Sequence, residues 1–293
     1  MREMDAISQQ KIWIVIPVFN RKATTLGCLL HLEKLGIFDW AEVIVADGGS
    51  SDGTPEAIRA DFKRVHLLEG KWWWMEGIRA GMEYAQQQEA KIYVWLNDDC
   101  RPREGSMEAL VQHTRQTSSI SGGITYSEDG GTYMGAVKTS QGLQSFTPKN
   151  LENVETLQAD ALVGNFVAIP EACVAKIGLP DAKMFPHLYG DYYYTFEASR
   201  AGFACFLIKA AAADDVHPLT NDRMSILRGD QPLKVIWRQL TQWNPHHGLL
   251  PEWRFYQRFW NGKGQVIVLK PWFKNWILFA LRILMPSWIR KRL

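Results

Sequence analysis

The sequence predicts an α/β protein with a mostly parallel central sheet and helices on both faces. Short apolar runs rich in β-branched residues alternate with segments of helical periodicity, and the spacing leaves room for one helix between consecutive strands. A change of composition near residues 220–235 adds a C-terminal extension that is rich in Trp and basic residues, and we expect it to be helical.

Residues 11–97 contain four strand-like runs separated by three helix-like segments. Each run ends at or near Asn, Asp or Gly, whereas each helix-like segment carries apolar residues three or four positions apart. Pro55 lies early in the second helix, where its missing N–H is tolerated. Strands are expected within 11–19, 42–54, 65–69 and 91–97, and helices within 26–35, 55–62 and 75–88.

Residues 118–160 are rich in Gly, Ser and Thr and predict short strands and loops. Beyond them we expect a buried strand within 159–170, a helix within 192–203 that ends at Gly202, and another strand within 204–218. The expected organisation is one domain over residues 1–225, with halves at about 11–117 and 118–225. The extension then covers residues 226–293.

Composition excludes several classes of protein. A chain of 293 residues with 46% hydrophobic and 22% charged residues is expected to be globular. Its four cysteines lie far apart, which argues against a zinc site or a disulfide framework and fits a reducing cytosol. The N-terminus has no apolar stretch typical of a secretory signal, and no apolar run is long enough to span a bilayer. No nucleic-acid partner is expected.

The sequence lacks two common nucleotide-binding motifs and contains one hydrolase-like motif. Neither GxGxxG nor GxxxxGK[ST] is present, so a nucleotide would have to bind this sheet without a glycine cradle. Residues 49–53, GSSDG, match the G-x-S-x-G nucleophile elbow between a strand and a helix, and His217 follows downstream. No HGGG-like oxyanion segment accompanies this elbow, and a hydrolase would leave the acids at 98–99 unexplained.

Four candidate ligand-binding residues lie at or just after the ends of predicted strands, where ligands bind in parallel sheets: Asn20, Asp47, Trp72 and Asp98. Two adjacent acids, Asp98 and Asp99, end a strand that looks buried, although like charges there repel each other. A divalent cation such as Mg²⁺ or Mn²⁺ would remove this repulsion, and it would bind phosphate oxygens as well. A lone His217 after a late strand is a candidate third ligand or a structural residue.

Two further features allow both a functional and a structural interpretation. Asp191 opens an aromatic helix, where desolvation would raise its pKa and suit it to proton transfer, but an acid at a helix N-terminus is also favoured by the helix dipole. The three indoles of residues 72–74 cannot all face one core in strand or helix geometry. At least one of them is therefore expected to be exposed or to line a pocket for a sugar or nucleobase ring.

Over about residues 11–218 the sequence resembles the glycosyltransferase family 2 enzymes, which have the GT-A fold. The resemblance rests on five ordered segments: IWIVIPVFNR, VIVADGGSSDGT, EGKWWWMEGIRAGMEYA, VWLNDDC and VGNFVAIP…IGLPDAKMFPHLYGDYYYTFEASRAGF. It implies an inverting, metal-dependent transfer of a sugar from a nucleoside-diphosphate sugar to a hydroxyl of a glycan or lipid-linked acceptor. The third segment is similar to that of a branch related to polysaccharide synthesis.

The resemblance also implies roles for individual residues. Asp191 would be the general base, Asp99 and His217 would bind Mg²⁺ or Mn²⁺, and Asp98 would share in holding the metal and diphosphate. Residues 11–117 would bind the donor and residues 118–225 the acceptor. Donor binding would involve Pro17, Phe19, Asn20, Arg21, Asp47, Trp73, Trp74, Gly77, Asn97 and Asp98.

The sequence departs from the family pattern at two positions. Gly48 stands where many members have a second Asp, and Glu197 stands where members commonly have Arg, so any contact carried over to Glu197 is in doubt. Two other classes of protein are alternatives to this function. A sugar-1-phosphate nucleotidyltransferase needs a Gly-rich basic loop after the first strand, and PVFNRKATT contains no glycine. An inactive carbohydrate- or nucleotide-binding module would not require intact Asp98, Asp99 and Asp191.

The C-terminal extension is expected to lie on a membrane surface. Residues 234–293 contain eleven Lys or Arg, one acid, Glu252, and seven of the thirteen tryptophans. An apolar stretch within 271–293 is bracketed by Trp272, Trp276 and Trp288, and basic residues 290–292 would attract anionic lipid. The protein is then expected to be cytoplasmic and peripheral on the inner face of the membrane. The alternative is a helix that packs on the rest of the chain or on a second subunit, as in a homo-oligomer.

Overall fold

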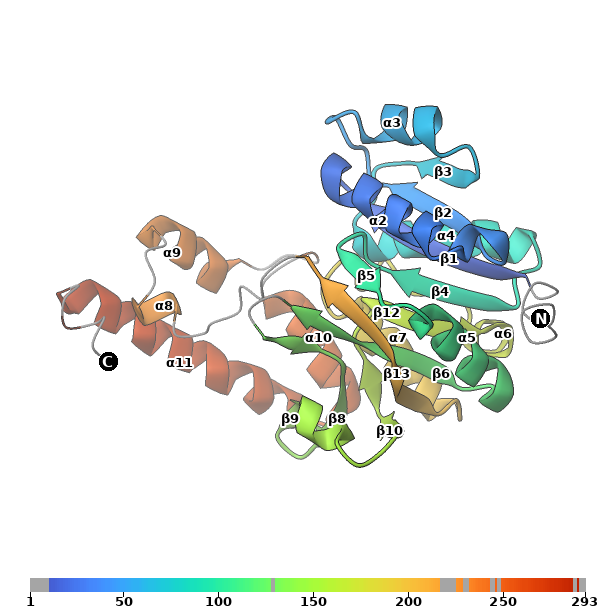
Figure 1. The fold of residues 1–293 in the computed structure, drawn as a ribbon. Helices are drawn as coiled ribbons and strands as arrows, with labels where there is room; N and C mark the ends of the chain where they lie inside the picture. The colour runs from blue at the N-terminus through green and yellow to red at the C-terminus, as the bar shows by residue number, and fades with distance from the viewer. Residues whose placement is uncertain are drawn as a thin grey trace. The chain divides into compact units, whose positions relative to one another are not determined.

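The computed structural model of the chain describes residues 11–127, 130–216, 225–228, 232–242, 246, 249–286 and 289 (Figure 1). The chain divides into two compact units. The first consists of residues 1–138 and 144–218, and the second of residues 139–143 and 219–293.

The first unit is built around a ten-stranded sheet. Its strands follow the order β10-β13-β6-β12-β4-β1-β2-β3, with β5 paired to β13 and β7 paired to β6. A three-stranded sheet has the order β11-β8-β9. The strands are β1 (Ile12–Val18), β2 (Glu42–Asp47), β3 (Val65–Glu69), β4 (Ile92–Leu96), β5 (Cys100–Pro102), β6 (Ile120–Ser127), β7 (Thr132–Tyr133), β8 (Gly135–Thr139), β9 (Gly142–Ser145), β10 (Thr156–Ala159), β11 (Ala161–Leu162), β12 (Phe166–Pro170) and β13 (Cys205–Asp215).

The strands of the block β4-β1-β2-β3 are parallel, as are β6 and β13, which confirms the predicted class. Val18 of β1 is in register with Asp47 of β2, and Asp47 with Glu69 of β3, so these strands end at one edge of the sheet. Beyond β4 the sheet is mixed, because β12 runs antiparallel to both β4 and β6.

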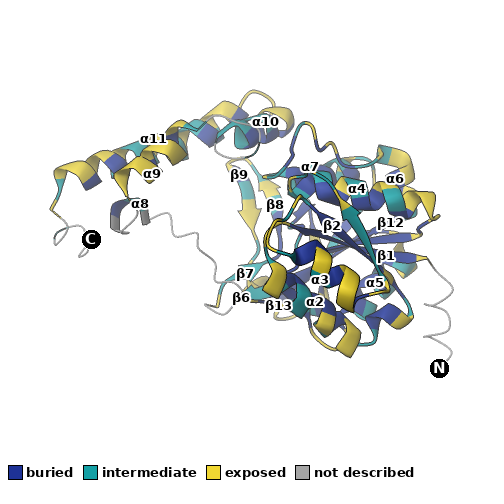
Figure 2. Ribbon diagram, turned by 90° about the horizontal axis from the view of Figure 1, so that it is seen from above, coloured by how far each residue is buried: buried dark blue, intermediate teal, exposed yellow. Residues whose placement is uncertain are grey.

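Helices cover both faces of this sheet, as predicted. On β1 the even-numbered apolar residues pack in one core cluster, and Trp13 and Val15 pack in the other. The first cluster includes side chains from helices α2 (Lys22–Lys34), α3 (Thr54–Asp61) and α5 (Ser106–Thr117). The second includes side chains from α4 (Trp74–Gln87), α6 (Glu171–Ile177) and α7 (Gly190–Arg200). The buried strands between these two layers are dark blue in Figure 2.

The segment 159–170, expected as one buried strand, is interrupted at residues 163–165, between β11 and β12. Gly164 lies in this interruption, and a Cβ there would be 2.5 Å from the Trp74 ring and 2.9 Å from the Asp191 Cβ. Close approach of the backbone to these two side chains therefore requires glycine. The predicted end of α7 is confirmed, since Gly202 follows it with φ of +96°.

The second unit contains four helices in the described part of residues 219–293, as predicted for the extension, whereas its residues 139–143 belong to the β8–β9 hairpin. Trp276 of α11 packs with a buried cluster formed by Ile236, Leu240 and Phe279. In the described part of the chain no helix is both long enough and apolar enough to cross a bilayer. The helices are α8 (Ser225–Arg228), α9 (Leu233–Thr241), α10 (Leu249–Phe259) and α11 (Gly264–Leu284). Short 3₁₀ helices in the chain are η1 (Ile37–Asp39) and η2 (Pro148–Leu151).

Candidate active site

A cavity of about 410 Å³ lies at the edge of the sheet where β1 and β2 end. Its lining is mainly aromatic and aliphatic, with two cationic side chains, Arg21 and Lys71. Five predicted donor-binding residues line it: Pro17, Phe19, Arg21, Trp73 and Trp74. The other lining residues are Val18, Ala46, Gly48, Lys71, Trp72 and His187.

The three indoles of residues 72–74 have three different surroundings. Trp72 lies over Gly70, where an added Cβ would come within 2.2 Å of its ring. Trp73 is 42% exposed and its ring lies 5.6 Å from that of His187. Trp74 packs edge-on against Trp95 inside the molecule. The expectation that at least one of them is exposed or lines a pocket is confirmed.

The loops after β1 and β2 are joined by hydrogen bonds. The backbone amide of Asn20 donates to Ser50 Oγ (2.8 Å), and Asn20 Oδ1 accepts from the backbone amide of Ser51 (2.8 Å). Ser51, at the nucleophile position of the elbow motif, contacts Asn20 Oδ1 through its hydroxyl at 3.4 Å. Asn20 thus orders this loop, and nothing in these contacts supports the serine-hydrolase alternative.

Asp47 ends β2 and is almost fully buried. Its Oδ1 accepts hydrogen bonds from the amides of Gly49 (2.9 Å) and Ser50 (2.7 Å). Its Oδ2 is buried and has no hydrogen-bond partner in the described residues. A buried carboxylate oxygen without a partner fits a ligand that supplies a donor, such as a ribose hydroxyl or a base N–H.

The acid pair follows β4 and is bridged by Arg21. Arg21 Nη1 lies 3.1 Å from Asp98 Oδ1, and Arg21 Nη2 lies 2.8 Å from Asp99 Oδ2. Asp98 Oδ2 accepts a hydrogen bond from Thr25 Oγ1 (2.9 Å). Burial raises the pKa of Asp98 to about 6, with a smaller contribution from Asp99, although Arg21 opposes the rise. The two acids therefore lie in a low-dielectric site with one cation between them.

One carboxylate oxygen of this pair fits a divalent cation. Asp99 Oδ1 is buried and has no hydrogen-bond partner in the described residues, and hard cations prefer such oxygens. The amide of Val216 donates to the Asp99 carbonyl (3.1 Å), so β13 ends beside the pair. His217 lies outside the described residues. Within the described ranges, no group of three or more His, Cys, Asp and Glu side chains is placed to hold a metal ion.

Asp191 lies in the first turn of α7 and is held by two backbone amides. Its Oδ2 accepts from the Gly164 amide (2.8 Å) and its Oδ1 from the Tyr192 amide (2.8 Å). Burial raises the pKa of Asp191, and these two hydrogen bonds oppose the rise. A carboxylate with a raised pKa and a fixed orientation can accept a proton from a hydroxyl.

Asn97 connects the acid pair to the segment that holds Asp191. Trp74 Nε1 donates to Asn97 Oδ1 (2.8 Å), and Asn97 Nδ2 donates to Asn165 Oδ1 (3.2 Å). The backbone amide of Asn97 also donates to the backbone carbonyl of Asn165 (2.9 Å). A role for Asn165 in the site was not predicted. The available signal was the Gly-Asn pair at 164–165, which interrupts an apolar run.

Two other positions singled out in the sequence, Gly77 and Glu197, are not among the residues that line the cavity. Gly77 is buried in α4, and a Cβ there would lie 3.4 Å from Pro17 Cβ, so glycine lets α4 approach β1 closely. Its predicted contact with the donor stays a prediction. Glu197 pairs with Arg200 at 3.1 Å and does not line the cavity.

Comparison with known proteins identifies the family. The family model "Glycosyl transferase family 2" matches residues 13–173, which is more than half of the chain. No significant match is found among curated proteins. The solved structures that match show the same fold at low sequence identity.

One similar structure is a crystal structure of GalNAc-T7 with UDP, GalNAc and Mn²⁺. The two share 13% identity with a TM-score of 0.58 over 90% of this chain and 55% of that chain, so this chain spans about half the length of GalNAc-T7. Another is the mannosyltransferase PcManGT from Pyrobaculum calidifontis in complex with GDP-Man and Mn²⁺, with 14% identity and a TM-score of 0.56. That match covers 96% of this chain and 77% of that chain.

The GT-A fold, the cavity at the strand ends and the family match agree with the resemblance of the five sequence segments. The chain belongs to glycosyl transferase family 2.

Proposed function

We propose that the protein is an inverting, metal-dependent enzyme that transfers a sugar from a nucleoside-diphosphate sugar to a hydroxyl of a glycan or lipid-linked acceptor. The observation that carries this proposal is a pair of acid sites, the Asp98–Asp99 pair with its buried Asp98 and the half-buried Asp191, joined through Asn97 and Asn165. The complexes of GalNAc-T7 with UDP and Mn²⁺ and of PcManGT with GDP-Man and Mn²⁺ support it by analogy.

The cavity is proposed to bind the nucleotide. Aromatic faces such as Phe19, Trp73 and Trp74 suit planar rings and the apolar faces of sugars. Asp47 would accept a hydrogen bond from the ribose or the base through its unpartnered Oδ2. Arg21 would contact the diphosphate, since a guanidinium binds phosphate oxygens in a bidentate manner.

Asp99 and His217 would hold Mg²⁺ or Mn²⁺, with Asp98 beside them. The chemistry that such an ion supplies is Lewis-acid stabilisation of the departing diphosphate. Asp191 would take the proton of the acceptor hydroxyl as its oxygen attacks the anomeric carbon, while the nucleoside diphosphate leaves from the opposite side. The hydrogen bonds from Gly164 and Tyr192 would keep the Asp191 carboxylate in position during this step.

A donor screen tests this proposal against the two alternatives. UDP-, GDP- and dTDP-sugars are incubated with Mn²⁺ or Mg²⁺ and the released products are identified. We expect release of a nucleoside diphosphate from one donor class. Formation of pyrophosphate from a nucleoside triphosphate and a sugar 1-phosphate would instead indicate a nucleotidyltransferase, and binding without any turnover would indicate an inactive module.

The C-terminal extension is proposed to lie on the inner face of the cytoplasmic membrane and to bring the active site to a lipid-linked or polymeric acceptor. Five of the six exposed large apolar residues of α11 form one stripe, because their spacings of seven, four, four and three return to the same helix face, and the sixth, Ile283, lies off this face. These residues, called the α11 stripe below, are Val266, Phe273, Ile277, Leu281 and Leu284. Figure 2 shows exposed residues along this helix.

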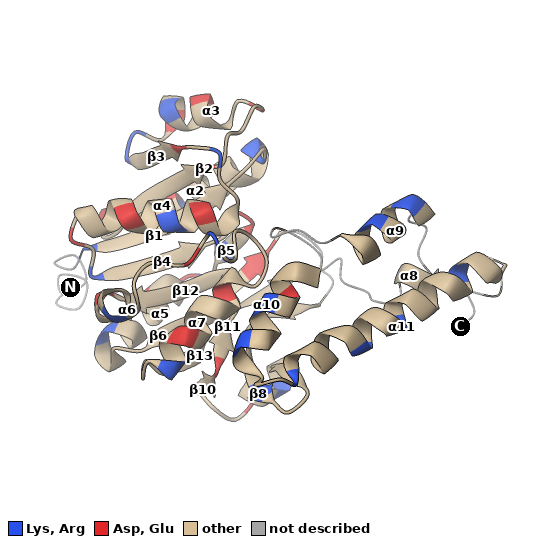
Figure 3. Ribbon diagram, turned by 180° about the vertical axis from the view of Figure 1, so that it is seen from behind, with Lys and Arg blue, Asp and Glu red and all other residues tan. Residues whose placement is uncertain are grey.

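The charge of the extension favours an anionic surface. Exposed Lys270 and Lys274 lie on the same helix as the α11 stripe. Basic residues recur along α9, α10 and α11, whereas the acid in the described part of these helices is Glu252 of α10 (Figure 3). An anionic lipid surface attracts each nearby Lys or Arg by about 1 kcal/mol.

Two tryptophans predicted to contribute to membrane binding, and one arginine of α11, have other partners. Trp272 Nε1 donates to the Leu240 carbonyl (3.0 Å), and Trp276 packs edge-on against Trp237. Arg282 is buried and donates to the Ile226 carbonyl (2.9 Å). These three side chains join α11 to α8 and α9, so the proposed membrane contact rests on the α11 stripe. Trp288 and residues 290–292 lie outside the described residues.

Flotation with anionic liposomes tests the membrane proposal. We expect the full chain to float with vesicles that contain phosphatidylserine and to remain in solution with neutral vesicles. Ile277→Ser combined with Lys274→Glu should reduce flotation at least about tenfold, because it removes apolar contact and reverses a charge. Lys34→Glu combined with Lys149→Glu, which changes exposed lysines of the first unit, should leave flotation unchanged.

Absence of flotation by the unmodified chain at low salt would contradict the membrane proposal. Sedimentation would then show whether the α11 stripe serves self-association instead. A concentration-dependent dimer that Ile277→Ser dissociates would assign the stripe to a second copy of the chain.

A further inference from the structure

Arg21 lies between the cavity and the acid pair. It is the residue that precedes α2, its side chain is 35% exposed, and it is one of the residues that line the cavity. Its two terminal nitrogens contact different acids, Asp98 and Asp99, at 3.1 and 2.8 Å. One guanidinium therefore serves both carboxylates and is also accessible to a ligand in the cavity.

The acid pair has little capacity left for a metal ion while Arg21 is in this position. Both oxygens of Asp98 are engaged, one by Arg21 and the other by Thr25. Asp99 Oδ2 is engaged by Arg21, so Asp99 Oδ1 is the one side-chain oxygen of the pair without a partner in the described residues. Divalent cations take about six oxygen ligands, and the positive guanidinium beside the pair repels them.

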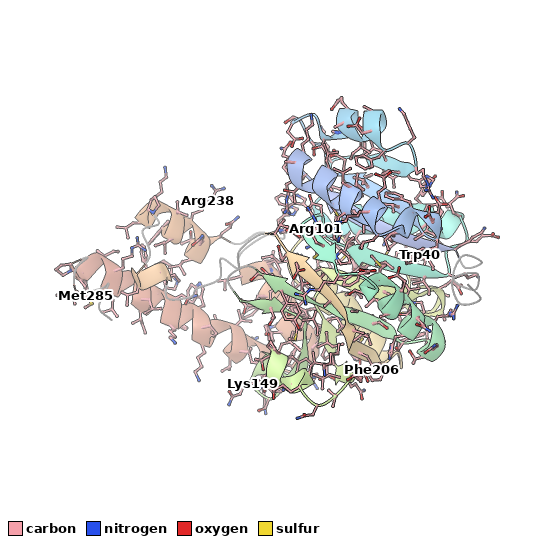
Figure 4. The ribbon with its side chains drawn as sticks, viewed as in Figure 1. Trp40, Arg101, Lys149, Phe206, Arg238 and Met285 are labelled. Atoms are coloured by element: carbon pink, nitrogen blue, oxygen red, sulfur yellow. The ribbon has the colours of Figure 1, made fainter. Side chains whose placement is uncertain are left out.

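Neither neighbouring cation is placed to take over the role of Arg21. Arg101, labelled on β5 in Figure 4, donates to the backbone carbonyls of Thr24, Asp98 and Cys100. Lys71 lines the same cavity, but forms no ion pair in the described part of the chain. Among these residues, Arg21 alone is in contact with the two carboxylates.

We propose that Arg21 is the resident counter-ion of the Asp98–Asp99 pair and that it moves to the diphosphate of the donor when a divalent cation binds at Asp99. This inference rests on the proposed function of the site. A diphosphate offers the guanidinium two charged acceptors in exchange for the two carboxylates that it gives up. The diphosphate also supplies the oxygen ligands that the cation lacks.

The exchange makes the binding of cation and donor cooperative. Without a diphosphate, the cation displaces Arg21 from the two acids and leaves its guanidinium without a partner, which costs free energy. With a diphosphate bound, the guanidinium has a new partner and this cost disappears. Coupling between two ligands is reciprocal, so the cation must increase the affinity for the nucleotide by the same factor that the nucleotide increases the affinity for the cation. Arg21 thereby acts as a positioning residue that prevents stable metal binding before the donor arrives.

Titration with Mn²⁺ alone, followed by electron paramagnetic resonance of the free ion, tests this role without knowledge of the donor. We expect Arg21→Gln to bind Mn²⁺ about tenfold more tightly than the unmodified protein, equivalent to about 1.4 kcal/mol. Lys71→Gln removes a cation from the same cavity without touching the acids and should change the Mn²⁺ affinity less than twofold. Asp99→Asn added to Arg21→Gln should abolish the gain.

A second arm adds UDP or GDP. We expect one of the two to raise the Mn²⁺ affinity of the unmodified protein at least about tenfold, and to raise that of Arg21→Gln by a factor at least about threefold smaller, because only the ligation of the cation by the diphosphate remains. If Arg21→Gln fails to fold, Arg21→Lys replaces it. A lysine keeps the charge but cannot contact both acids with two nitrogens of one planar group, so an increase of about threefold in the affinity for Mn²⁺ alone is expected.

The outcomes separate this inference from the proposed function. Tight Mn²⁺ binding that requires Asp99 but is unchanged or weakened in folded Arg21→Gln would overturn the counter-ion role and leave the metal site intact. Absence of Mn²⁺ binding by every variant, with UDP and with GDP, would overturn the metal assignment itself.

Discussion

Asp191→Asn is expected to abolish sugar transfer while leaving donor affinity within a few-fold of the unmodified protein. The amide keeps the size of the side chain and can still accept a hydrogen bond from Gly164, but it cannot accept the proton of the acceptor. Loss of a general base costs about 10²–10⁴-fold in rate. Single-turnover kinetics with the donor class found in the screen measure the rate, and calorimetry measures donor binding.

Glu197→Gln is the matched control, because Glu197 lies on the same helix and pairs with Arg200 outside the cavity. Its turnover should stay close to that of the unmodified protein. Retained turnover in Asp191→Asn would remove Asp191 from the mechanism. An equal loss of donor affinity and rate would assign it to the donor and metal site instead.

The pH dependence of turnover follows from the burial of Asp191. A general base must be ionised, and burial raises the pKa of this carboxyl, so the active form is lost at a higher pH than for an ordinary aspartate. Activity is expected to be full above the raised pKa and to fall as the pH decreases through it. The acid limb of the kcat profile should therefore lie above the usual aspartate pKa.

Asp99→Asn is expected to lose turnover at least about 100-fold and to lose the effect of Mn²⁺ on donor binding. The substitution makes the unpartnered Oδ1 position neutral and removes the charge that would hold the cation. A catalytic metal contributes several kcal/mol of charge stabilisation, and each 1.36 kcal/mol is tenfold in rate.

Asp214→Asn is the control for this experiment, because Asp214 is an exposed acid that pairs with Arg103 near the end of β13. It should retain both turnover and Mn²⁺-dependent binding. Unchanged turnover of Asp99→Asn would contradict the metal assignment.

Local patterns were sufficient to predict the strand ends that form the cavity. Successive side chains of a strand point to opposite faces, so the continuous apolar runs of β1 and β4 face both helix layers, and parallel pairing places Val18 and Asp47 in register. The donor-binding residues implied by the family resemblance include Phe19, Arg21, Trp73 and Trp74, and these meet at this edge of the sheet.

Contacts between distant parts of the chain could not be predicted in this way. Arg21 reaches acids more than 70 residues away, and Asn97 meets Asn165 because β12 inserts antiparallel beside β4. Neither pairing leaves a periodic signal in the sequence. The membrane interpretation of Trp272 and Trp276 was incomplete for the same reason, since their partners lie on α9.

Proton NMR of the sugar released from the preferred donor tests the central claim most directly. The reaction is followed from its first minutes in two samples, one with Mn²⁺ and one with excess EDTA. Inverting, metal-dependent chemistry predicts that the first product has the opposite anomeric configuration to the donor and that the EDTA sample shows no release. A first product with the donor's own configuration, or equal release in EDTA, would contradict the mechanism proposed for Asp191 and Asp99.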